Sequence, residues 1–84
     1  MNPTMEANLS MLLSDRIVVD ERIRFGKPVI RGTRVPVDLV LGKLAAGMTY
    51  DEVEAEYGLQ REDIFAALDY AARCVSGEEV KAIA

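Results

Sequence analysis

Residues 26–37, GKPVIRGTRVPV, contain the two turn signals and the strand-to-helix junction around which the rest of the fold is arranged. Glycine adopts positive φ angles without steric cost, so Gly26 and Gly32 each mark a sharp turn. Pro28 and Pro36 lack the N–H that an inner strand donates, so a strand that holds either proline lies at a sheet edge or begins there. The stretch therefore predicts a short edge strand, a tight turn and the start of a helix.

Two short strands are predicted on either side of Gly26. Residues 16–20, RIVVD, and residues 28–30, PVI, are rich in β-branched side chains and are bounded by charged residues or glycine. Together they predict a small N-terminal β-hairpin.

Three helices are predicted after the hairpin. The first follows Pro36, has apolar residues at helical spacing and ends at Gly47. The second begins with a T-x-x-E capping box at residues 49–52 and runs to about residue 57. The third begins at residues 61–63, where two acids favour the helix dipole, and runs to about residue 75. The expected fold class is mainly α with a small N-terminal β-hairpin (α+β), a three-helix domain of helix-turn-helix-like, winged-helix-like form.

A chain of 84 residues is long enough for one domain and no more. We expect this domain over residues 16–76, after a flexible or short helical extension at residues 1–15 and before a charged tail at residues 77–84. The helical alternative for the extension rests on apolar residues at helical spacing: Met5, Leu9, Leu12 and Leu13.

The residue types present exclude several kinds of catalytic site. There is no histidine and only one cysteine, so zinc sites with the usual ligands and Ser-His or Cys-His nucleophile pairs cannot form within one chain. The acids of the second helix do not share one helix face, so they favour a solvated surface over a metal site. We expect a protein that is not an enzyme and that needs no metal or cofactor. No apolar run approaches the roughly 20 residues that span a bilayer, and the expected location is cytoplasmic.

Positive charge is concentrated in one part of an acidic chain. Residues 16–34 contain six basic and two acidic residues, whereas residues 35–84 contain four basic and ten acidic ones, and the net charge of the chain is −4. The second and third helices are acidic, so phosphates would repel them, and any attraction to DNA must come from the basic segment. The predicted DNA-binding residues are Arg22, Arg24 and Lys27.

The same segment predicts a site for an anion or an acidic partner. Turns at Gly26 and Gly32 would let the backbone approach a phosphate or carboxylate closely. The side chains predicted to bind such a group are Lys27, Arg31, Thr33 and Arg34. The order of residues is not that of a G-x-x-x-x-G-K-[ST] loop, because the lysine follows the first glycine, so nucleotide hydrolysis is not expected. Two alternatives stay open: a hairpin whose charges are simply solvated, and a small-anion-binding sensor or enzyme built on the two turns.

The third predicted helix has more apolar surface than one core face requires. A surface helix usually buries a stripe about 100° wide, and Phe65 and Tyr70 lie beside the stripe that contains Ile64 and Leu68. This surplus predicts a homodimer whose interface contains Phe65 and Tyr70. The alternative is a monomer in which the strands cover the same surface.

Residues 16–72 closely resemble a small bacterial family, the domain of unknown function numbered four-three-three. They contain its G-K-P-V-I-x-G-T-R core at residues 26–34, its G-x-[ST]-x-[DE]-E turn at residues 47–52 and its A-L-x-Y-A-A motif at residues 67–72. The resemblance implies a helix-turn-helix-like domain, often encoded beside a nuclease-like partner with a PIN-type fold, and hence an antitoxin of a toxin–antitoxin pair. The motif positions carried over are Gly26, Lys27, Pro28, Gly32, Thr33 and Arg34.

The resemblance and the charge pattern together predict a noncatalytic, antitoxin-like regulator that neutralises a nuclease and binds its own operator DNA. A PIN-type nuclease holds an acidic metal site, so an inserted arginine could pair with those carboxylates and displace the metal. Arg31 and Arg34 are the candidates for this contact.

Overall fold

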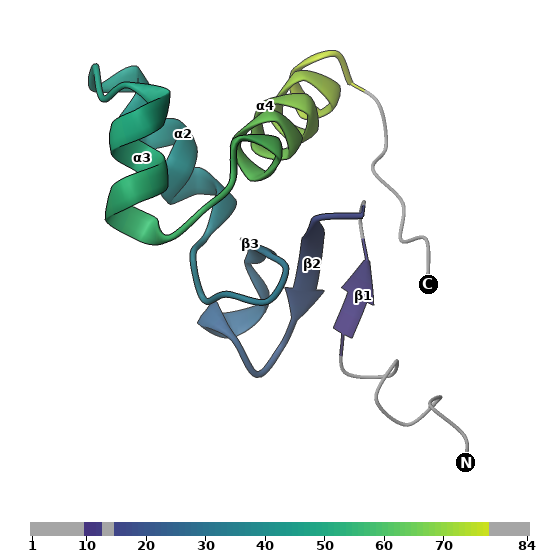
Figure 1. The fold of residues 1–84 in the computed structure, drawn as a ribbon. Coiled ribbons are helices and arrows are strands. Elements are labelled where there is room, and N and C mark those ends of the chain that lie inside the picture. Colours follow the sequence, from purple (N-terminus) through teal and green to yellow (C-terminus); the bar gives the residue numbers. More distant parts are fainter. Residues whose placement is uncertain (1–9, 13–14, 78–84) are drawn as a thin grey trace.

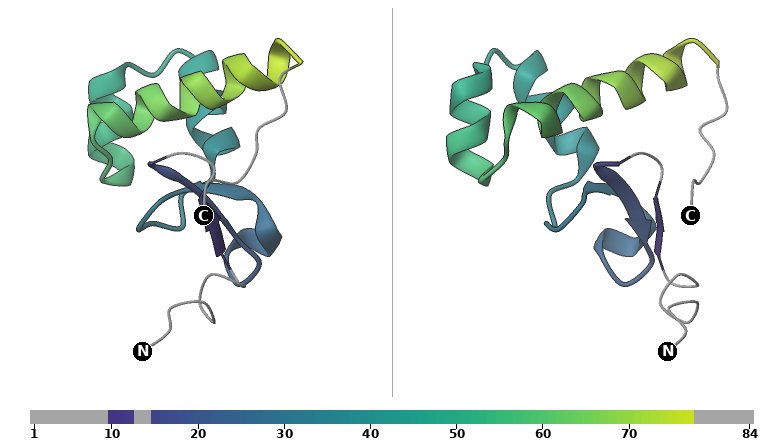
Figure 2. Two further views of the ribbon diagram at one scale, coloured as in Figure 1. Left: turned by 90° about the vertical axis from the view of Figure 1, so that its right-hand side faces the viewer. Right: turned by 45° about the vertical axis from the view of Figure 1, so that its right-hand side comes forward.

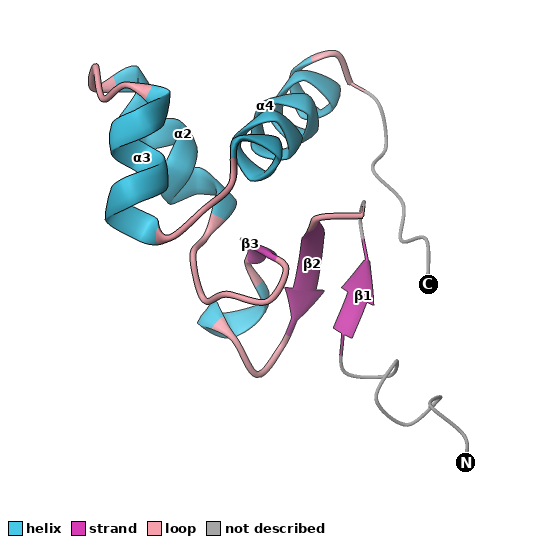
Figure 3. Ribbon diagram, viewed as in Figure 1, coloured by secondary structure: helices cyan, strands magenta, loops and turns pink. Residues whose placement is uncertain are grey.

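The computed structural model describes residues 10–12 and 15–77, which form a three-stranded sheet and three helices (Figure 1 and Figure 3). The strands are β1 (Ser10–Leu12), β2 (Ile17–Asp20) and β3 (Pro28–Ile30), with a short turn, η1 (Arg24–Gly26), between the last two. The helices are α2 (Val37–Ala45), α3 (Tyr50–Tyr57) and α4 (Arg61–Val75). The helices lie together, with the sheet below them (Figure 2). The predicted α+β fold with three helices is confirmed.

The sheet is antiparallel, with the order β1-β2-β3. Its β2–β3 pair is the predicted hairpin, in which Ile17 pairs with Ile30 and Val19 pairs with Pro28. Pro28 is the first residue of an edge strand, where its missing N–H leaves no inner ladder bond unmade.

Strand β1 was not predicted. It places Met11 opposite Val19, along the edge of β2 that the hairpin leaves open. An open edge offers a row of unpaired N–H and C=O groups, and pairing with them outweighs the helical spacing of the apolar residues. Of the two alternatives for this extension, flexible or short helical, the helical one is therefore wrong at residues 10–12, which include Leu12, whereas Met5, Leu9 and Leu13 lie outside the described residues.

Local signals define the helix ends. The Thr49 hydroxyl accepts a hydrogen bond from the Glu52 backbone N at 3.1 Å, and the Thr49 backbone N donates to Glu52 Oε1 at 2.8 Å, as a capping box requires. Gly58 ends α3 with a φ of 67°. Helix α2 begins at Val37, because the extended backbone of Pro36 makes that proline the N-cap and not the first helical residue.

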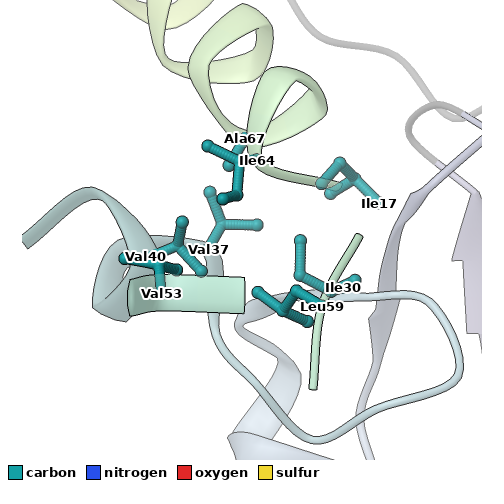
Figure 4. Close-up of a cluster of buried hydrophobic side chains, with 8 residues drawn as sticks. All are labelled: Ile17, Ile30, Val37, Val40, Val53, Leu59, Ile64 and Ala67. Carbon is teal, nitrogen blue, oxygen red and sulfur yellow. The ribbon is translucent and has the colours of Figure 1, made fainter. Parts of the chain in front are cut away.

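A single hydrophobic core joins the hairpin to the helices (Figure 4). Its buried side chains come from β2, β3, all three helices and the α3–α4 link: Ile17, Ile30, Val37, Val40, Val53, Leu59, Ile64 and Ala67. The basic segment therefore lies on a hairpin that the core holds against the helices. No helix in residues 10–12 and 15–77 is long and apolar enough to cross a membrane.

Candidate interaction surface

The loop at residues 31–34 is shaped by its own hydrogen bonds. Thr33 Oγ1 donates to the Ile30 carbonyl oxygen at 2.7 Å and accepts from the Val35 backbone N at 3.0 Å. Gly32 has a φ of 81°, in the left-handed region that glycine enters freely. Because the Thr33 hydroxyl is bonded on both sides, it holds the turn, and a ligand would have to replace these bonds to use it.

The two arginines of this loop are held differently. Arg31 Nη1 donates to the backbone oxygen of Asp15 at 3.1 Å. Arg34 is exposed, and within the described residues its guanidinium makes no hydrogen bond or ion pair. Of the two candidates for contact with a partner, Arg34 therefore has the guanidinium that is open to an incoming carboxylate.

Arg31 and Gly32 border an open hollow of about 440 Å³ whose other walls are Asp15, Arg16 and Asp63. Arg16 Nη1 binds Asp63 Oδ1 at 2.9 Å, which ties β2 to the start of α4. The two carboxylates in this hollow, Asp15 and Asp63, balance the charge of the two guanidiniums, so it is poorly suited to a small anion.

Asp63 has a structural role that was not predicted from the sequence. It is buried, and its Oδ2 accepts from the Gln60 backbone N at 2.9 Å, which caps α4. The Q-x-x-D spacing at residues 60–63 was the signal for this cap. Nothing local signalled its ion pair with Arg16, which is 47 positions away.

Arg22, one of the three predicted DNA-binding residues, is bound to Asp20. Its Nε lies 3.0 Å from Asp20 Oδ1, its Nη2 lies 2.8 Å from Oδ2, and its backbone N donates to Oδ1 at 2.9 Å. These hydrogen bonds, first of all those of the guanidinium, hold the pKa of Asp20 below its ordinary value. Arg22 therefore serves chiefly as the partner of a buried carboxylate.

Arg24 and Lys27 are more accessible. Lys27 Nζ lies 3.3 Å from Asp38 Oδ2, and both side chains are more than half exposed, at 59% and 66%. Within the described residues the side chains of Arg24 and Lys43 make no hydrogen bond or ion pair. All four residues border a hollow of about 380 Å³ beside α2. Three cations and one acid thus meet here, which makes this the more cationic of the two hollows.

The η1 turn that contains Arg24 has an unusual backbone. Arg24, Phe25 and Gly26 have φ angles of 54°, 58° and 81°, so three successive residues lie in the left-handed region. This conformation costs of order 1–2 kcal/mol for a residue with a Cβ atom. Hydrogen bonds from Gly26 N to Ile23 O at 3.1 Å and from Lys27 N to Arg24 O at 3.2 Å hold it.

The start of α4, where a helix-turn-helix protein would read DNA, has its arginine committed to neighbours. Arg61 binds Glu54 through Nε and Asp51 through Nη2, and its guanidinium carbon lies 5.1 Å from the centre of the Tyr50 ring. The pKa of Arg61 lies above its ordinary value, mainly because of the hydrogen bond to Glu54. Arg61 thus links α3 to α4 and adds little positive charge to the surface.

A family model matches the elements that carry these residues. Residues 17–71, from β2 to the last third of α4, match the family described as protein of unknown function (DUF433). The chain belongs to the DUF433 family.

Relatives of this DUF433 chain include two matches in Mycobacterium tuberculosis. A protein named "Putative antitoxin VapB45" is 42% identical over 53 residues, which are 63% of this chain and 22% of that protein. The crystal structure of Rv2018 superposes with a TM-score of 0.58 and 40% identity, over 62% of this chain and 24% of the other. An uncharacterised protein of Archaeoglobus fulgidus is 62% identical over 24 residues, 29% of this chain and 67% of that protein. This chain spans less than a quarter of the length of its mycobacterial matches.

The two residues predicted for a dimer interface lie on different sides of α4 in this DUF433 chain. Phe65, 51% exposed, packs edge-on against Tyr50 of α3 with ring centres 5.9 Å apart. Tyr70 is half-buried and borders an apolar hollow together with α2. Burial, helped by the neighbouring Cys74 thiol, raises the pKa of Tyr70 above its ordinary value. One flat contact would therefore not bury Phe65 and Tyr70 equally.

Proposed function

We propose that this chain is a noncatalytic, antitoxin-like protein of a toxin–antitoxin pair and that its partner is a PIN-type nuclease. The observation that carries the proposal is the 42% identity over 53 residues to the mycobacterial protein named "Putative antitoxin VapB45". The match covers 63% of this chain, so it is more than one isolated motif.

The proposed contact uses Arg34 and Arg31. Arg34 offers a whole guanidinium, and the one hydrogen bond shown for the Arg31 side chain is to a backbone carbonyl. A guanidinium pairs with a carboxylate through two parallel hydrogen bonds, and a Mg²⁺-dependent nuclease binds its metal with carboxylates. Insertion of these arginines would therefore compete with the metal for the same oxygens, while Thr33 holds the loop in shape.

Co-expression with a PIN-type nuclease, if one is encoded beside this gene, tests the proposal. The wild-type chain should restore growth and co-purify with the nuclease. The double variant Arg31→Ala, Arg34→Ala should stay folded by circular dichroism and lose protection, because exposed arginines contribute only about 0–1 kcal/mol to stability. The matched control, Lys43→Ala with Arg73→Ala, removes the same charge elsewhere and should protect fully. A wild-type chain that neither protects nor co-purifies, or the absence of any such neighbouring gene, would contradict the proposal.

Binding to operator DNA is a second proposed activity. It is favoured by the open guanidinium of Arg24 beside Lys27 and Lys43, which gives this acidic chain one surface where phosphates are attracted. Autoregulation of the pair would follow if this surface binds DNA upstream of the gene.

A further inference from the structure

The η1 turn holds an aromatic ring entirely in water. Phe25 is fully exposed and is the most exposed large apolar side chain in the described part of the chain. Its backbone is also strained, since it has a φ of 58° without being glycine. The strain reduces the stability of the single chain while the exposed ring adds nothing to it, and strained residues of this kind cluster where proteins bind ligands and partners.

An apolar hollow is lined by residues that follow this ring closely in the sequence. No side chain of the described residues fills it. It measures about 260 Å³, and its walls are Pro28, Val37, Leu41 and Tyr70, with Lys27 and Asp38 at the rim. Lys27 at the rim and Pro28 in the wall follow Phe25 by two and three positions in the sequence. A projecting ring and an apolar hollow therefore lie next to each other on one chain.

This arrangement fits a second copy of the same chain. In a two-fold symmetric contact, residue i of one copy meets residue j of the other and the reverse. Adjacent projection and hollow satisfy this condition, because each Phe25 can enter the hollow beside the other copy's Phe25. Two flat apolar patches would not explain why the ring is held outward.

The charges at the rim are also self-complementary. Lys27 and Asp38, 3.3 Å apart and mostly exposed, can exchange partners across a two-fold axis so that each lysine meets the other copy's aspartate. The rest of the chain opposes association, since its net charge is −4 and α3 has four acids and no basic residue. The η1 side differs from α3 in carrying both signs, with Arg24, Lys27 and Lys43 beside Asp38, so a cation of one copy can face an acid of the other.

We propose that two copies of this chain associate through this face, with the Phe25 ring of each copy seated in the hollow formed by Pro28, Val37, Leu41 and Tyr70 of the other. This inference does not depend on the proposed antitoxin role. In this dimer the interface contains Phe25 and Tyr70, and Phe65 lies outside it.

Analytical ultracentrifugation of the full chain over a series of concentrations tests the contact. Phe25→Gly should weaken the dimer about tenfold or more, because each copy loses the burial of a phenyl ring. It should not lower the Tm of the monomer, since glycine adopts a φ of 58° without strain. Tyr70→Glu should weaken the dimer from the side of the hollow, and the control Phe65→Ala should leave it unchanged.

A fluorescent probe gives an independent reading, because the chain contains no tryptophan. The emission of Phe25→Trp should move to shorter wavelength as the protein associates, and that of the matched Phe65→Trp should not. A wild-type chain that stays monomeric at several hundred micromolar overturns the proposal. So does a Phe25→Gly dimer as tight as the wild type, or a dimer that only Phe65→Ala abolishes.

Discussion

Asp20 is the residue on which the start of the η1 turn depends. Its carboxylate is buried, with 6% of the residue exposed, and it accepts three hydrogen bonds from Arg22. Its backbone oxygen accepts from Ile23 N at 2.9 Å, one residue before the left-handed stretch begins. Removal of Arg22 would leave this carboxylate buried without its partner, which is usually more costly than losing the pair.

The stability of the chain should therefore depend on the protonation of Asp20. The hydrogen bonds from Arg22 lower the pKa of Asp20 in the folded state below the ordinary value of 3.8, so the unfolded chain binds this proton more tightly. The stabilisation is fully present above pH 3.8 and is lost as the pH falls through the lower, folded pKa. Urea unfolding at neutral pH and below pH 3.8 should show Asp20→Asn much less stable than the wild type at neutral pH, with the difference shrinking in acid. An equal difference at every pH would contradict this account.

The elements were predictable where the signals are local. The capping box at Thr49 and the left-handed stop at Gly58 each depend on contacts within about one helical turn, and the bounds of α3 follow from them. Strand β1 was missed because pairing along the edge of β2 is a long-range event. The left-handed conformation of Phe25 was missed because neither its side chain nor its neighbours favour it. In the candidate surface, the cluster of cations was predictable. The sequence analysis treated Arg22 as free to bind DNA, because it did not predict the pairing of Arg22 with Asp20.

Substitutions at Gly32, in the turn between β3 and α2, should be costly because of backbone conformation and not because of steric clashes. A Cβ atom at Gly32 would meet no atom within 4 Å, yet its φ is 81°. Gly32→Val should therefore lower the free energy of unfolding by about 1–2 kcal/mol, and Gly32→Asn by less, because asparagine tolerates this region. Gly42 in α2 is the contrast, since it also has open space but no positive φ, so Gly42→Ala should stabilise by roughly 0.5–1 kcal/mol. Equal losses for Val and Asn at position 32, measured by urea unfolding, would point to a steric cause.

At the scale of the whole molecule, charge is divided between two ends. Helix α3 and the start of α4 present acids, and their one arginine, Arg61, is bound to Glu54 and Asp51. The hairpin end carries a group of exposed cations: Arg24, Lys27, Arg31 and Arg34. DNA would therefore approach the hairpin end, and only a few phosphates could be neutralised there.

Binding to DNA upstream of the gene should accordingly be weak and should fall steeply with salt. The variant Arg24→Ala, Lys27→Ala should weaken it for all DNA sequences and reduce the slope of log affinity against log salt by about 2, since each phosphate contact contributes roughly 0.9. Arg22 is left in place, because its replacement would take the guanidinium away from the buried Asp20 carboxylate and confuse folding with binding. Arg61→Ala should leave the affinity unchanged while lowering the Tm, since Glu54 loses its partner across α3 and α4. Fluorescence anisotropy at several salt concentrations decides between the two surfaces: if Arg61→Ala abolishes binding and the double variant binds like the wild type, α4 reads the DNA and the hairpin does not.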